Sequence, residues 1–239
     1  MQKPSSGASA RFVVGNWKCR KSLTASHEWL AEFSAGYEPV DGVEVVVAAP
    51  MILLAPLAAR LQQIGMRHFW LAAQDVSPYP SGNYTGATSA AMLKEVCSHV
   101  IVGHPERRRY FHETALDAVN KVSEAADADL APIIFVDEIN AMSQLTALAD
   151  IDCARLISAF TAADELNYQK PPSVEKLSRI ASYIAQVYPA RPLLYGGRIG
   201  RRTHEDVLSV PEISGFVVGD DSLQPRAFLS IVKAVQDAA

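Results

Sequence analysis

The 239-residue sequence has few of the features of a secreted or membrane protein. It contains only three cysteines, Cys19, Cys97 and Cys153, and an odd number without metal-ligand spacing favours free thiols in a reducing compartment. No apolar run is long enough to span a bilayer, and Met1–Ala10 lacks the apolar core of a secretory signal. We therefore expect a cytoplasmic protein without a membrane partner.

An excess of positive charge is also missing. The chain has 22 lysines and arginines against 26 aspartates and glutamates, whereas a nucleic-acid-binding protein needs a basic surface. The short runs Arg107–Arg109 and Arg201–Arg202 are more typical of solvated turns. The six histidines show no paired ligand spacing, and no dinucleotide fingerprint follows the first predicted strand. We expect neither a metal site nor a cofactor.

Short apolar, β-rich runs alternate with amphipathic or alanine-rich segments along the whole chain. The predicted strands are Phe12–Gly15, Val43–Ala48, Phe69–Ala73, His99–Val102, Ile133–Val136, Leu156–Ala159, Leu193–Tyr195 and Phe216–Val218. The predicted helices are Ser22–Phe33, Ile52–Ile64, Ser89–Val96, Ala115–Ala128, Ala141–Ala149, Val174–Val187, His204–Val210 and Pro225–Ala238. This alternation predicts an α/β fold with a parallel sheet. Eight units at this length predict one (β/α)₈ barrel domain, with residues 1–10 as a flexible extension.

Local signals fix several helix ends. Ser173 is suited to cap the helix that follows it, and Pro225 is suited to a first helical position. Gly65 would end the helix before it. No linker rich in proline, glycine or serine divides the chain, which agrees with one domain.

The sequence is organised around Val100–Arg108. Three apolar residues indicate the end of a buried strand, Gly103 breaks it, and His104 and Glu106 follow at once. An imidazole and a carboxylate at one strand end are a plausible acid–base pair, but a surface turn with solvated charges fits these residues equally well.

In a barrel, chemistry is located where strands end and the following loops begin. That rule selects Gly15–Lys18, Gln74–Tyr84, Gly103–Glu106, Asp137–Glu138, Phe160–Pro172, Gly196–Gly200 and Gly219–Ser222. A family resemblance is found at these segments. The motifs that carry it are Val14–Lys18, Ala72–Ser77, Gly82–Gly86, Val102–Arg108, Tyr195–Gly197 and Gly215–Gly219. In this order they resemble the motifs of the triosephosphate isomerase family, over nearly the whole chain.

The resemblance implies roles for four residues. Lys18 would stabilise an enediolate and the anionic group of the substrate, and Asn16 would help to position both. His104 would polarise the carbonyl as a neutral imidazole, a role for which this family is a standard example. Glu106 would handle protons near Lys18. The expected reaction interconverts glyceraldehyde 3-phosphate and dihydroxyacetone phosphate, or a close analogue.

The general base of the family is missing from its usual place. Alignment back from the helix after the sixth strand puts Thr161 where the family has a glutamate. A threonine hydroxyl cannot abstract a carbon-bound proton near neutral pH without activation. Asp164 or Glu165 could replace the base from a restructured lid, and Asp137 at the end of the fifth strand is a further candidate.

The predicted phosphate site also departs from the family. Gly196, Gly197 and Gly219 remain as substrate-binding positions, but Arg198 stands where serine is usual and Asp220 where glycine is usual. A carboxylate at an anion site repels phosphate unless it turns away or pairs with a cation. Arg198 could be that cation, could bind an anion itself, or could point to solvent together with Asp220.

The Gln74–Gly86 loop corresponds to the family's homodimer interface, so a homodimer is expected, although Ala87 replaces a glutamate that normally pairs with an arginine of the histidine motif.

The first functional hypothesis is an isomerase of the family with impaired or altered activity. The second is a barrel enzyme with a changed substrate, phosphorylated or not. The third is a non-catalytic relative that binds a ligand or partner at the same mouth.

Overall fold

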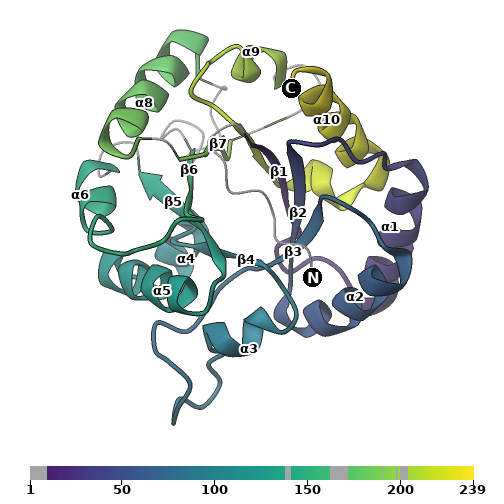
Figure 1. Ribbon diagram of the computed structural model, residues 1–239, viewed down its shortest axis with the longest axis horizontal. Coiled ribbons are helices and arrows are strands. Elements are labelled where there is room, and N and C mark those ends of the chain that lie inside the picture. Colours follow the sequence, from purple (N-terminus) through teal and green to yellow (C-terminus); the bar gives the residue numbers. More distant parts are fainter. Residues whose placement is uncertain (1–9, 138–140, 162–171, 190, 198, 200–203) are drawn as a thin grey trace.

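The computed structural model describes residues 10–137, 141–161, 172–189, 191–197, 199 and 204–239. Its parallel strands pair in sequence order, and the first pairs with the eighth, so the sheet closes into a barrel (Figure 1). The strands are β1 (Arg11–Asn16), β2 (Val43–Ala49), β3 (Phe69–Ala73), β4 (His99–Val102), β5 (Ala131–Asp137), β6 (Ile157–Thr161), β7 (Leu193–Tyr195) and β8 (Gly215–Val218). The predicted (β/α)₈ barrel is confirmed.

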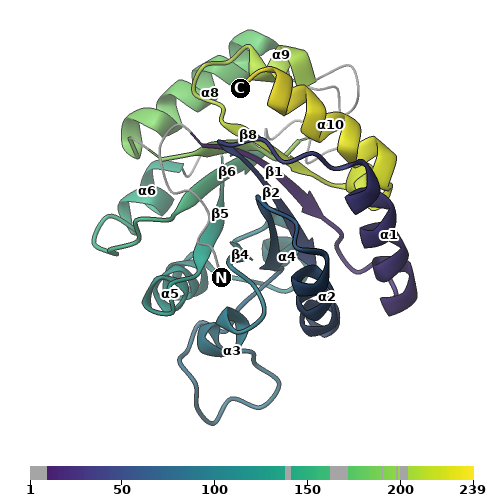
Figure 2. The ribbon, with the colours of Figure 1, turned by 45° about the vertical axis from the view of Figure 1, so that its right-hand side comes forward.

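Helices surround the barrel (Figure 1). They are α1 (Leu23–Gly36), α2 (Met51–Ile64), α3 (Ala90–Lys94), α4 (Pro105–Tyr110), α5 (Ala115–Asp127), α6 (Ala141–Thr146), α8 (Val174–Val187), α9 (His204–Leu208) and α10 (Pro225–Asp237), with a 3₁₀ turn η1 (Asp220–Leu223). The segment between β3 and α3 projects from the body of the molecule in both ribbon views (Figures 1 and 2). No helix in the described ranges is long and apolar enough to cross a membrane.

The strands are apolar on both faces because each face is covered. Phe12 and Val14 belong to a cluster that fills the barrel, whereas Val13 between them packs in the layer between the sheet and the helices. The cluster inside the barrel comprises Ala10, Phe12, Val14, Val46, Ala48, Ala72, Ile101, Ile133, Phe135, Ile157, Ala159, Leu194 and Val217. The barrel is therefore a packed core, and polar chemistry is confined to its ends.

The predicted helix signals are confirmed at three positions. The Ser173 hydroxyl accepts a hydrogen bond from the Lys176 backbone N–H, and Pro225 is the first residue of α10. Gly65 ends α2 in the left-handed region, with φ of 71°. Several boundaries differ from prediction, and one difference matters for the site: β6 continues to Thr161 instead of ending at Ala159.

Helix α4 was not predicted, and it changes the setting of the histidine motif. His104 is the N-cap of this helix and Pro105 is its first residue, so Glu106 lies on the first turn rather than on a strand end.

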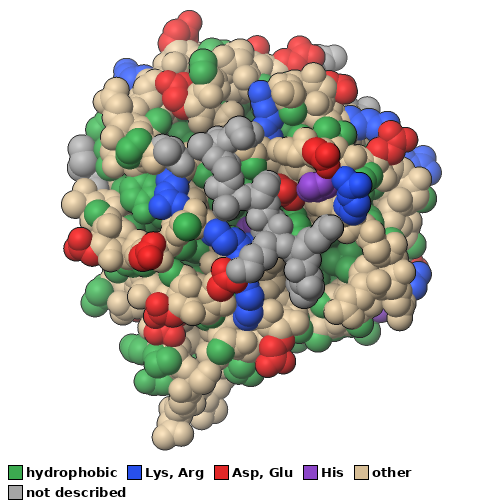
Figure 3. Space-filling view, viewed as in Figure 1, with side chains coloured by type: hydrophobic (Ala, Val, Ile, Leu, Met, Phe, Trp, Pro, Cys, Tyr) green, Lys and Arg blue, Asp and Glu red, His purple; other side chains and the backbone are tan. Residues whose placement is uncertain are grey.

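On the described part of the face in Figure 3, basic and acidic side chains are interspersed rather than gathered by sign. Residues 1–9, most of the predicted flexible extension, lie outside the described residues.

Candidate active site

The four predicted catalytic residues meet at one mouth of the barrel. The Lys18 Nζ atom, in the loop after β1, lies 2.5 Å from Glu106 Oε1 on α4. Both side chains are partly exposed, at 34% and 43%. Glu106 Oε2 lies 3.8 Å from His104 Nδ1, and Asn16 Oδ1 accepts a hydrogen bond from the Lys18 backbone N–H at 3.0 Å. An ammonium, a carboxylate and an imidazole therefore lie side by side.

His104 is held as a neutral imidazole. Its Nδ1 atom accepts a hydrogen bond from the Glu106 backbone N–H at 3.2 Å, so the ring proton lies on Nε2. Burial lowers the pKa of His104 to about 4; the negative charge of Glu106 opposes this shift, and the positive charges of Lys18 and Arg108 add to it. The ring packs against the edge of Phe135 with centroids 4.7 Å apart. Its Nε2–H is thus the hydrogen-bond donor of the ring.

Lys18 adopts a conformation that is rare for a residue with a side chain. Its φ is 50°, in the left-handed region, and such strain persists only where neighbours over-determine the backbone. Gln74 provides that restraint, because its Nε2 atom donates to the carbonyl oxygens of Lys18 and Ala48, both at 3.0 Å. The sequence placed Gln74 in the dimer loop and gave no signal for this contact.

Thr161, predicted from the sequence to stand at the position of the family's base, is the last residue of β6. Its hydroxyl donates to the carbonyl oxygen of Gly196 at 3.0 Å. Asp137, the last residue of β5, pairs in register with Thr161. The other two candidate bases, Asp164 and Glu165, lie outside the described residues, as does the side chain of Asp137.

The three predicted glycine positions lie in the loops after the last two strands, Gly196 and Gly197 after β7 and Gly219 after β8. A Cβ at Gly196 would lie 2.8 Å from the Phe135 ring, so only glycine fits there. A Cβ at Gly219 would meet no described residue within 4 Å.

The structure gives Asp220 a cation that the sequence did not indicate. Asp220 Oδ1 lies 3.3 Å from Arg20 Nη1 in the loop after β1, and both side chains are largely exposed. Arg198, the partner suggested by the sequence, lies outside the described residues.

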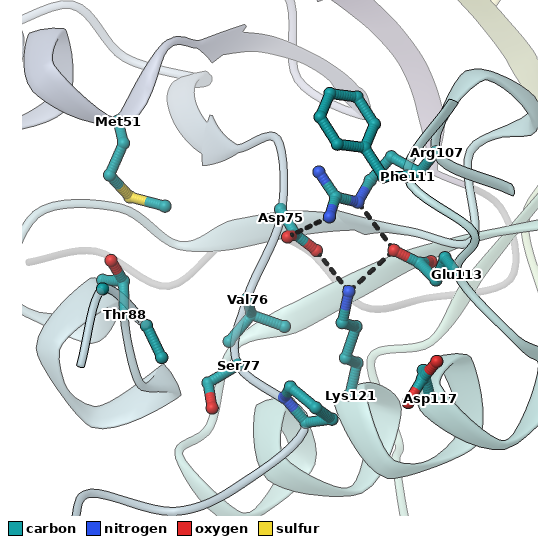
Figure 4. Close-up of a pocket in the computed structure, with 13 residues that line it drawn as sticks. Met51, Asp75, Val76, Ser77, Thr88, Arg107, Phe111, Glu113, Asp117 and Lys121 are labelled. Atoms are coloured by element: carbon teal, nitrogen blue, oxygen red, sulfur yellow. Dashed lines mark hydrogen bonds and ion pairs between the residues drawn. The ribbon is translucent and has the colours of Figure 1, made fainter. Parts of the chain in front are cut away.

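Arg107 corrects the prediction of a solvated arginine run. Its guanidinium contacts Asp75 at 2.7 Å and Glu113 at 2.6 Å, and Lys121 Nζ lies 2.6 and 2.7 Å from the same two carboxylates (Figure 4). These residues line a pocket of about 290 Å³. Ala87 lines the same pocket, so Asp75 and Glu113 provide the negative charge that a glutamate at position 87 would bring.

The described residues contain no group of three or more histidine, cysteine or acidic side chains that could hold a metal ion. All three cysteines are free thiols; Cys19 is exposed, and Cys97 and Cys153 are buried.

Comparison with known proteins identifies relatives over nearly the whole chain. The family model for triosephosphate isomerase matches residues 11–235. A triosephosphate isomerase from Herminiimonas arsenicoxydans is 33% identical over 249 residues, which cover 94% of this chain and 98% of that protein. One from Dehalococcoides mccartyi is 29% identical over 243 residues, covering 93% and 95%. One from Stenotrophomonas maltophilia is 29% identical over 248 residues, covering 94% and 97%.

Proposed function

The chain belongs to the triosephosphate isomerase family, and on that premise we propose that it interconverts a small ketose phosphate and an aldose phosphate. The reaction is an intramolecular aldose–ketose isomerisation, with glyceraldehyde 3-phosphate and dihydroxyacetone phosphate, or a close analogue, as substrates. The observation that carries the proposal is the 2.5 Å contact between Lys18 and Glu106 beside the neutral imidazole of His104.

The residues at the mouth suit the charge that this reaction develops. Removal of a proton from the carbon next to a carbonyl places negative charge on the carbonyl oxygen. The Lys18 ammonium would stabilise that charge, and the Nε2–H of His104 would donate a hydrogen bond to the same oxygen. A neutral imidazole is suited to this role because it donates without bringing a positive charge that the buried site would have to solvate.

The proposed activity is impaired or altered because the usual base is absent. The Thr161 hydroxyl donates a hydrogen bond to the Gly196 carbonyl oxygen, and a hydroxyl is too weak a base to take a carbon-bound proton near neutral pH. We propose that a carboxylate replaces it, with Asp137, Asp164 and Glu165 as the candidates. Asp137 has the support of its register with Thr161.

Two specific residues favour the alternatives. Asp220 at the predicted phosphate site favours a barrel enzyme with a changed, non-phosphorylated substrate, because a carboxylate repels phosphate. Thr161 favours a non-catalytic relative that binds a ligand or partner. The retained set of Asn16, Lys18, His104 and Glu106 supports catalysis over the non-catalytic alternative.

We further propose a homodimer that forms through the Gln74–Gly86 loop. The exposed aromatic rings of Tyr79 and Tyr84 in this projecting loop support it, because a second copy would cover them. A cytoplasmic location is a further proposal, which the three free thiols support.

The decisive experiment is solvent-deuterium exchange into dihydroxyacetone phosphate and glyceraldehyde 3-phosphate at high enzyme concentration. We expect exchange and interconversion that disappear in Lys18→Ala. The variants Asp137→Asn, Asp164→Asn and Glu165→Gln then identify the base, because only its removal abolishes exchange while the fold is retained. A folded wild-type protein that shows no exchange would overturn the isomerase proposal and leave the alternatives.

A further inference from the structure

Hydrogen bonds join the loop after β1 and helix α1 to the turn η1 after β8, and these segments form one unit. The indole N–H groups of the buried Trp17 and Trp29 both donate to the Ser222 carbonyl oxygen, at 3.2 and 3.0 Å. Lys21 Nζ donates to the Leu223 carbonyl oxygen at 3.0 Å. These contacts hold the backbone of η1 in place. The side chains of Arg20 and Asp220 at its edge can therefore change partners while the backbone stays where it is.

Arg20 and Asp220 form the outer contact of this unit. Their closest atoms lie 3.3 Å apart, and the side chains are 57% and 78% exposed. Solvent screens so exposed a pair, and holding two side chains in one geometry costs entropy, so the pair adds little net stability. Both groups can therefore exchange the contact for a ligand at little cost.

The location of the pair gives it a role in substrate binding. Arg20 follows Lys18 by two residues. Asp220 directly follows Gly219, where a Cβ would have no described residue within 4 Å. The loops after the seventh and eighth strands are the frequent place for phosphate in barrels of this kind. A bare carboxylate there would repel a phosphate, whereas a guanidinium matches phosphate oxygens with two parallel hydrogen bonds.

We propose that Arg20 is a specificity-determining residue that exchanges Asp220 for the phosphate group of the substrate when the substrate binds. The inference rests on the proposed function and assigns recognition of the substrate's phosphate group to the Arg20 side chain. Asp220 holds the guanidinium at the mouth in the free protein and releases it to the stronger anion. For a neutral tail, Arg20 would stay on Asp220 and contribute nothing to binding.

The test compares Arg20→Gln, Asp220→Asn and the double variant with the wild type. Binding of inorganic phosphate is measured by calorimetry at low and high salt, and kcat and KM are measured with the triose phosphates. The matched control is Arg67→Gln, because Arg67 forms a similarly exposed pair with Asp41 (58% and 86%) before β3, at the opposite end of the strands.

We expect Arg20→Gln to weaken phosphate binding and to raise KM about tenfold or more, the scale of a hydrogen bond to a charged group, with kcat within about twofold. The salt dependence of binding should also fall, since one cation is lost. Asp220→Asn should bind phosphate more tightly, and Arg67→Gln should match the wild type.

The double variant separates direct binding from simple neutralisation. If Arg20 contacts the phosphate, the double variant stays weak; if Arg20 only cancels the charge of Asp220, the double variant recovers wild-type affinity and the inference is wrong. An unchanged KM in Arg20→Gln, with exchange and turnover intact in the wild type, overturns this inference alone. A wild-type protein that neither binds phosphate nor exchanges deuterium overturns the proposed function as well.

Discussion

The hydroxyl of Thr161 donates a 3.0 Å hydrogen bond to the carbonyl oxygen of Gly196, and this contact joins the ends of β6 and β7. The hydroxyl therefore has a structural role at the position that the sequence predicts for the family's base. Restoration of a carboxylate there tests whether the rest of the mouth is still competent.

We expect Thr161→Glu to raise the isomerisation rate by about 10²–10⁴-fold, the usual contribution of a positioned general base. Isomerisation of both triose phosphates is the measurement. Thr161→Gln is the control, since its amide has a similar size but cannot accept the proton. A rate that rises equally in both variants, or in neither, would mean that the missing carboxylate does not limit this site.

Most of the barrel could be predicted because its signals are local. Strand–helix alternation needs only the order of apolar runs, and the motifs around Lys18 and His104 are contiguous. Helix α4 was missed because Pro105–Tyr110 is short, mostly charged and without apolar periodicity. The sequence pattern therefore predicted the bounds of β4 correctly, but its prediction of the backbone conformation after His104 was wrong.

The contacts that tune the site could not be predicted, because they join residues far apart in the chain. Arg20 and Asp220 are 200 positions apart, and no pattern around either one indicates the other. The same holds for Gln74, which restrains the backbone of Lys18 across 56 positions. Only the closed barrel brings these loops together, and this explains why the sequence offered Arg198, and not Arg20, as a possible partner of Asp220.

The buried carboxylate of Glu113 should matter more for stability than its exposed counterparts. One oxygen accepts the Gly103 backbone N–H at 2.8 Å, and the other contacts Arg107 and Lys121 at 2.6 and 2.7 Å. Glu113→Ala removes one of the two carboxylates that Arg107 and Lys121 contact and leaves only Asp75. We therefore expect the free energy of unfolding, measured in urea, to fall by about 3 kcal/mol.

Asp41→Asn is the control for this variant, because its ion pair with Arg67 is exposed, and we expect a change below about 1 kcal/mol. Burial opposes ionisation of Glu113, but hydrogen bonds from Lys121 and Arg107 outweigh it and hold the pKa below the usual range. The contribution is therefore present above about pH 4.5 and is lost as the pH falls below that value. Equal effects of the two variants would refute the special role of the buried carboxylate.

The aromatic pair in the loop after β3 should control assembly. The rings of Tyr79 and Tyr84 stack with centroids 4.8 Å apart, and both residues are nearly half exposed. We expect the wild type to sediment as a dimer and Tyr84→Asp to shift toward monomer at the same concentration. Tyr183→Asp, an exposed tyrosine on α8, is the control and should remain dimeric. A monomeric wild type would contradict the proposed interface.

The buried His99 at the start of β4 should make the protein less stable in acid. Its Nδ1 atom and the Ser98 hydroxyl share a hydrogen bond at 2.8 Å, and burial, followed by the positive charges of Arg155 and Lys94, lowers its pKa to about 3. In the unfolded chain His99 binds a proton with the ordinary pKa of 6.5, whereas in the folded protein it stays neutral until the pH is near 3. The free energy of unfolding therefore falls as the pH drops from 6.5 toward 3, by at most about 1.4 kcal/mol per pH unit from this residue.

Replacement of the imidazole by a group that does not titrate should remove this dependence. We expect His99→Gln to flatten the curve of unfolding free energy against pH between 3 and 6.5, with the two proteins differing least in slope above pH 7. Urea unfolding at half-unit pH intervals measures both curves. Because His104 and Glu113 contribute slopes of the same sign in both proteins, the difference between the curves isolates His99. Parallel curves would mean that the folded protein protonates His99 as readily as the unfolded chain does.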